Sequence, residues 1–110
     1  MKKLIRDGKV AVLVSPGFGA GWYTWNNCHP ECLYDPDIAE IVLGGINGDA
    51  IRKIRKIAKI KYGKNFYTGG ASQLEVEWIP IGSRFLLDEY DGSETLTREE
   101  DCPWHTAEVE

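Results

Sequence analysis

Lys9-Val-Ala-Val-Leu-Val-Ser15 is the stretch that decides the fold, because it is almost continuously apolar and rich in β-branched residues. A strand with one wet face alternates apolar and polar residues, whereas a strand buried on both faces does not. We therefore expect a central strand at residues 9–15, which ends where Pro16 interrupts the pattern.

Two helices are expected after this strand. Asp35 is a typical N-cap and Pro36 suits the first helical position, so a short helix should cover residues 36–43. A second helix should follow Asn47-Gly48 and run to Tyr62, because isoleucines recur there at helical spacing and a glycine comes next.

Beyond residue 64 the apolar period changes to two, which indicates strands with one face inward. One strand is predicted at residues 73–78 and a return strand at residues 84–90, joined by a turn at Pro80-Ile-Gly82. Asp91-Gly92 should form a two-residue hairpin turn that leads to a third strand at residues 94–97. The predicted fold class is α+β: a largely antiparallel β-sheet made of the N-terminal strand plus a C-terminal meander, with the two helices inserted between them.

Length and composition indicate a single soluble domain over residues 1–110. The chain is 43% apolar and 27% charged, which is the ordinary globular balance, and its length suffices for one core. The longest apolar runs, residues 10–14 and 38–43, are much shorter than a membrane helix, and no export signal is recognised. An odd set of three cysteines fits a reducing compartment, so we expect a cytoplasmic protein with no membrane partner.

The net charge of −4 conceals a strong asymmetry. Residues 48–64 carry seven Lys or Arg against one Asp, whereas residues 88–110 carry nine Asp or Glu against one Arg. The acidic segment and a pI of about 5.2 argue against binding to extended nucleic acid. The opposite charges could pair between two copies of the chain, so we expect a homo-oligomer.

Gly17-Phe-Gly-Ala-Gly-Trp-Tyr-Thr-Trp-Asn26 is the most unusual stretch, with three alternating glycines before three aromatic residues. It lacks the lysine and the following helix of the usual phosphate-binding loops. Two interpretations stay open: the rings enter the core, or they face a ligand and stack on it. For the second, the candidate ligand-binding residues are Gly17, Phe18, Gly19, Gly21, Trp22, Tyr23, Thr24, Trp25, Asn26, Arg84 and Arg98.

Four side chains could form a tetrahedral zinc site: Cys28, Cys32, Cys102 and His105. His29 is a spare ligand, and the alternative is three buried thiols and two imidazoles at the surface. No spacing identifies a general acid and base, or a nucleophile with its base. We therefore expect a protein that is not an enzyme and that carries no cofactor.

The blocks Ser15-Pro-Gly-Phe-Gly-Ala-Gly-Trp-Tyr-Thr-Trp25 and Glu75-Val-Glu-Trp-Ile-Pro-Ile-Gly-Ser-Arg-Phe85, followed by Glu89-Tyr-Asp-Gly-Ser-Glu94, resemble a family of short proteins encoded by tailed bacteriophages. Small phage proteins of similar size and make-up include anti-defence "sponges" such as the Thoeris anti-defence proteins. These sequester cyclic nucleotide or cyclic ADP-ribose immune signals. The resemblance implies a role in the cytoplasm of a host bacterium, and it carries no ligand residue over to this chain.

Three functions follow from these observations. The first is a phage accessory protein that sequesters a small nucleotide-like ligand and thereby inhibits host defence. The second is an inhibitor that uses the acidic hairpin and tail to occupy a basic site on a host protein. The third is a zinc-binding protein or metalloenzyme.

Overall fold

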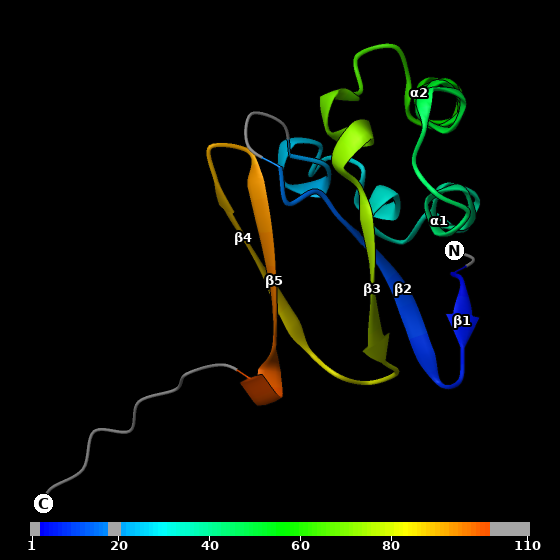
Figure 1. Ribbon diagram of the computed structural model, residues 1–110. Helices are drawn as coiled ribbons and strands as arrows, with labels where there is room; N and C mark the ends of the chain where they lie inside the picture. The colour runs from blue at the N-terminus through cyan, green and yellow to red at the C-terminus, as the bar shows by residue number, and fades with distance from the viewer. Residues whose placement is uncertain (1–2, 18–20, 102–110) are drawn as a thin grey trace, which may run out of the picture.

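The computed structural model describes residues 3–17 and 21–101. Strand β2 (Lys9–Val14) lies in the middle of an antiparallel sheet, between β1 (Ile5–Arg6) and β3 (Glu75–Pro80) (Figure 1). Asp7 and Gly8 turn β1 into β2 with positive φ angles of 51° and 74°, as a two-residue hairpin turn requires. The register pairs Val10 with Ile79.

The central strand is buried on both faces, as predicted. Ala11 and Leu13 belong to the core under the helices, whereas Val12 and Val14 belong to a second cluster on the opposite face of the sheet. A hairpin of β4 (Phe85–Tyr90) and β5 (Ser93–Arg98) covers this second face. The structure therefore has three layers: helices, sheet and hairpin (Figure 1).

Both predicted helices form: α1 covers Pro36–Leu43, as predicted, and α2 covers Gly48–Tyr62, starting one residue earlier than predicted. The Asp35 carboxylate accepts the N–H groups of residues 37 and 38, and the Asn47 side chain accepts the N–H of Ala50. Four short 3-10 helices complete the described chain: η1 (Tyr23–Trp25), η2 (Pro30–Tyr34), η3 (Gly69–Gln73) and η4 (Glu99–Asp101). Within residues 3–17 and 21–101, no helix has the length and apolarity to cross a membrane.

The fold class is α+β with antiparallel strands, as predicted, but the strands of the expected meander are divided between two sheets. β3 pairs with β2, and β4 pairs with β5. The physical reason is the apolar face formed by Val12, Val14 and Ile79. If β4 had extended the sheet beside β3, that apolar face would be exposed to solvent. Because β4 crosses over it instead, Phe85 and Leu87 pack against these residues.

Candidate functional site

The structure decides where Trp22 lies. Its ring has no exposed surface and meets Phe66 edge-on, with ring centroids 5.0 Å apart and planes at 71°. The indole Nε1 donates a hydrogen bond of 2.9 Å to the Cys32 carbonyl. Trp22 is therefore a core residue, which is the first of the two interpretations that the sequence left open.

Glu94 is a buried residue that the sequence analysis missed. Its carboxylate is 2% exposed and accepts four hydrogen bonds: from the N–H of Ser15 (2.8 Å), the N–H of Trp22 (2.9 Å), and both the N–H (2.8 Å) and the hydroxyl (2.7 Å) of Thr24. The acceptor on these backbone N–H groups is therefore a side chain of the protein itself. The sequence held a weak signal for this burial. Glu94 and Leu96 are two positions apart on a strand, so their side chains point to the same face, and Leu96 packs against the core.

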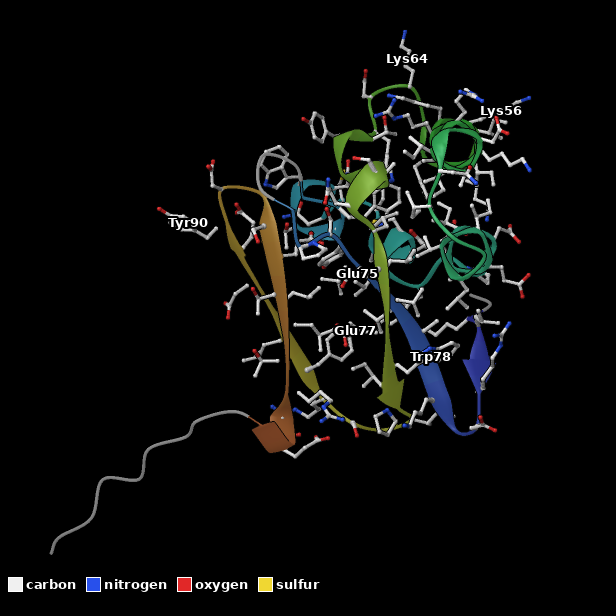
Figure 2. The ribbon with its side chains drawn as sticks, viewed as in Figure 1. Lys56, Lys64, Glu75, Glu77, Trp78 and Tyr90 are labelled. Atoms are coloured by element: carbon white, nitrogen blue, oxygen red, sulfur yellow. The ribbon has the colours of Figure 1, made fainter. Side chains whose placement is uncertain are left out.

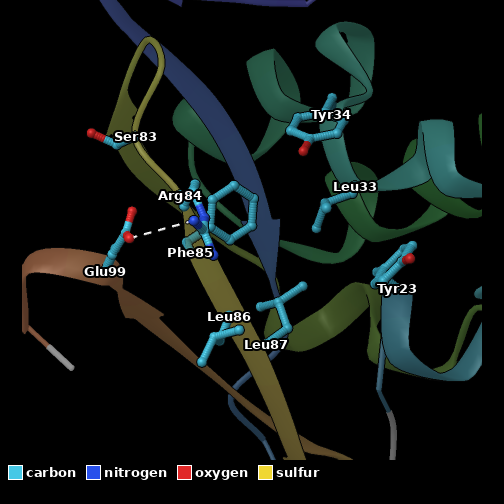
Figure 3. A pocket seen from close by; sticks show the side chains of 9 residues that line it. All are labelled: Tyr23, Leu33, Tyr34, Ser83, Arg84, Phe85, Leu86, Leu87 and Glu99. Atoms are coloured by element: carbon cyan, nitrogen blue, oxygen red, sulfur yellow. Dashed lines mark ion pairs between the residues drawn. The ribbon is translucent and has the colours of Figure 1, made fainter. Parts of the chain in front are cut away.

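A cleft of about 520 Å³ opens between the edge of β4 and the short helices η1 and η2 (Figure 3). Tyr23, Leu33 and Tyr34 form one wall, and Phe85 and Leu87 face them from β4 (Figure 3). The remaining lining residues lie just before β4, on β4 and at the start of η4: Ser83, Arg84, Leu86 and Glu99. Tyr23 and Arg84, two of the predicted ligand residues, are thus brought to one site from distant parts of the sequence.

An arginine lines the cleft, and a lysine outside it contacts one of the lining rings. Arg84 Nη1 lies 3.6 Å from Glu99 Oε1, and the arginine side chain is 82% exposed (Figure 3). The Lys3 ammonium lies 4.0 Å from the centre of the Tyr34 ring. Burial raises the pKa of Tyr34, and the neighbouring Tyr23 raises it further, so the phenol stays neutral and can donate a hydrogen bond. The described lining residues can hold and orient an aromatic anion, and they include no nucleophile paired with a base.

The other predicted ligand residues lie elsewhere. Trp25 is 40% exposed and its ring contacts Tyr67, away from the cleft. Asn26 is buried and bonds to the backbone of Tyr67. Arg98 pairs with Glu100 at 3.6 Å and lines a separate groove between β3 and β5. Gly17 and Gly21 flank a segment that contains Phe18 and Gly19, which lie outside the described residues.

A second, more polar cleft of about 640 Å³ lies where the start of α1 meets the end of α2. Its central carboxylate, Asp35, caps α1 and also receives the Tyr62 hydroxyl (2.6 Å) and the Lys61 ammonium (3.1 Å). Burial raises the pKa of Tyr62, and the hydrogen bond to Asp35 raises it further. These groups bond to one another and join the two helices, so we assign them a structural role.

The zinc candidates are only partly within the described chain. Cys28 is exposed and Cys32 is fully buried, whereas Cys102 and His105 lie outside the described residues. Burial raises the pKa of the Cys32 thiol, and the negative charges of Glu94 and Asp35 add to this effect. Within the described ranges, no group of three or more His, Cys, Asp or Glu side chains could hold a metal ion.

The contrast between the two cysteines predicts selective labelling. Iodoacetamide should modify Cys28 rapidly at pH 8, and Cys32 at least about a hundredfold more slowly, because alkylation needs an accessible thiolate. Peptide mass spectrometry after timed labelling measures both rates. Labelling in denaturant is the control, since it should make the two thiols comparable. Equal rates in the native protein would contradict the burial of Cys32.

The sequence and the structure were also compared with known proteins. No protein-family model, curated protein or solved structure was found to match the chain.

Proposed function

We propose that this protein binds a small nucleotide-like ligand in the cleft between β4 and the short helices η1 and η2. The observation that carries the proposal is the convergence of three rings, those of Tyr23, Tyr34 and Phe85, with an exposed arginine around about 520 Å³. Ligand sites of this kind combine apolar walls with a few polar groups that fix orientation. The cleft has the volume for a nucleotide and the donors that its two parts need.

The two parts of such a ligand would use different groups. A base would contact the aromatic walls, where the neutral Tyr34 hydroxyl can donate to it. A phosphate would compete with Glu99 for the Arg84 guanidinium, whose five donors match phosphate oxygens. Because the Arg84 pair is exposed, exchanging its partner carries a small energetic penalty.

Binding without turnover is what a sequestering protein requires. The resemblance to small phage proteins supports the same proposal, with a cyclic nucleotide or cyclic ADP-ribose immune signal as the ligand and inhibition of host defence as the result.

Calorimetric titration tests whether the cleft binds a nucleotide-like ligand. The protein is titrated with cyclic dinucleotides, cyclic trinucleotides and cyclic ADP-ribose isomers, and at least one should bind. Phe85→Ala should weaken that binding by about 1–3 kcal/mol because a stacking surface is lost, and Arg84→Gln should weaken it through the lost phosphate contact. Tyr90→Ala is the matched control: this ring lies on the same strand, is 78% exposed and does not line the cleft (Figure 2).

Two results would overturn the proposal. One is the absence of heat with every member of the panel. The other is a ligand that binds the folded Phe85→Ala and Arg84→Gln variants as tightly as the parent protein.

A second function is favoured by the outer face of the hairpin. Leu86 (53% exposed), which also borders the cleft, and Tyr90 (78% exposed) flank Asp88 on this face, and Asp91 follows Tyr90 in the turn. Exposed tyrosine and leucine among carboxylates suit a contact with a basic protein surface. We propose inhibition of a host protein as the alternative, and a binding loss caused by Tyr90→Ala would favour it.

A further inference from the structure

Trp25 and Tyr67 form an exposed aromatic pair outside the cleft. Their ring centroids are 5.2 Å apart with planes at 48°, and the two residues are 40% and 45% exposed. Trp25 ends η1, and Tyr67 lies in the loop that follows α2. Two large rings have therefore been brought together from separate segments and left half open to solvent.

The backbone beneath the pair is held by hydrogen bonds from side chains. The Asn26 amide accepts the N–H of Tyr67 at 2.8 Å and donates to its carbonyl at 2.9 Å, so one side chain clamps both backbone groups of Tyr67 next to Trp25. On the other side, the Lys59 ammonium donates to the carbonyls of Lys64 (2.8 Å) and Phe66 (2.7 Å). The rings are thus positioned before any ligand arrives, which reduces the entropy lost on binding.

Glycines lie directly behind both rings. A Cβ added at Gly21 would come within 2.8 Å of the Trp25 ring, and one added at Gly69 within 2.7 Å of the Tyr67 ring. Each ring therefore rests against glycine backbone on its inner side. A side chain at either position would push the ring out of the pair.

We propose that Trp25 and Tyr67 are a stacking platform for a nucleobase that carries a phosphate. An aromatic ring that is held rigid and half exposed is what base stacking uses. The surrounding charge favours a phosphate. Lys64 is in the same loop, three residues before Tyr67, and the Lys59 ammonium bonds to the carbonyl of Phe66, the residue next to Tyr67. The acidic hairpin argues against long polyanions, so the ligand is a single nucleotide or a short single strand.

The test uses the full chain, with a fluorescein-labelled hexathymidylate strand and AMP as probes. Trp25→Ala and Tyr67→Ala should each weaken binding of the strand, measured by fluorescence anisotropy, by about 5- to 150-fold. Trp25→Phe retains a ring and should retain most of the affinity. Phe85→Ala changes the cleft and its packing on the sheet but not the aromatic pair, so the folded variant should bind the strand like the parent. Each variant is first shown to melt near the parent temperature, and an alanine variant that does not is replaced by leucine at the same position, Trp25→Leu or Tyr67→Leu.

Competition with AMP shows whether the base comes from a single nucleotide or from a strand. Displacement of the strand by AMP shows that one nucleotide is enough, and binding of the strand without displacement shows that a chain is needed; both outcomes support the platform. The proposal is overturned if neither probe binds, or if the folded Trp25 and Tyr67 variants bind like the parent. Loss of binding in Phe85→Ala alone would place the base in the cleft, which would overturn the platform and support the proposed function.

Discussion

Replacing Glu94 with Ala should lower the free energy of unfolding by at least about 3 kcal/mol. The carboxylate accepts three backbone N–H groups and the Thr24 hydroxyl in a buried position. Its removal leaves those N–H groups without partners, and each unsatisfied buried donor costs about 1–3 kcal/mol. Urea denaturation followed by tryptophan fluorescence measures the change.

Two further variants separate the carboxylate's hydrogen bonds from its charge. Glu94→Gln keeps one oxygen acceptor and places an amide NH₂ against N–H donors, so it should lose roughly half as much stability as Glu94→Ala. Glu75→Ala removes an exposed carboxylate from β3 (Figure 2) and should change stability by less than about 0.5 kcal/mol. If Glu94→Ala were no more destabilised than Glu75→Ala, the four hydrogen bonds would not form in solution.

Glu94 also shows why the aromatic loop and the hairpin form one unit. The N–H of Glu94 bonds to the Ser15 carbonyl at 2.9 Å, and the Ser93 hydroxyl bonds to the Pro16 carbonyl. The start of β5 is thus tied to the end of β2, while the Glu94 side chain holds η1. Because Tyr23 lies on η1 and Phe85 on the partner strand of β5, this connection sets the distance between the two walls of the cleft.

The elements that depend on local chemistry were predictable from the sequence. Asp35 and Asn47 cap their helices through their own side chains, and the apolar run at β2 is buried on both faces. Asp91-Gly92 turns β4 into β5 with φ angles of 50° and 84°. The same dipeptide at Asp7-Gly8 was overlooked, and with it the short strand β1, although the signal is identical.

The contacts between distant segments were not predictable. The pattern of alternate residues could not show that Trp22 faces the core and Trp25 the solvent, because η1 follows neither a strand nor an α-helix period. The position of Tyr67 beside Trp25 was not predicted because it depends on Asn26, which bonds to Tyr67 from 41 residues away in the sequence. The cleft depends on β4 crossing over the sheet, and turn chemistry at Gly82 does not distinguish that path from an in-plane return.

Replacing Trp22 with Ala should lower the free energy of unfolding by about 3–5 kcal/mol, because it empties a fully buried site beside Phe66 that the surrounding core cannot refill. Trp22→Phe keeps a ring and loses the bond from the indole N–H to the Cys32 carbonyl, so it should cost about 1–3 kcal/mol. Trp25→Ala is the matched control. It removes the same side chain three positions further along the chain, at the last residue of η1, where the residue is 40% exposed, and the loss should be clearly smaller. Thermal and urea unfolding of the three variants measure the loss of unfolding free energy in each. Equal destabilisation by Trp22→Ala and Trp25→Ala would show that both rings are buried in solution, and it would remove the exposed ring on which base stacking depends.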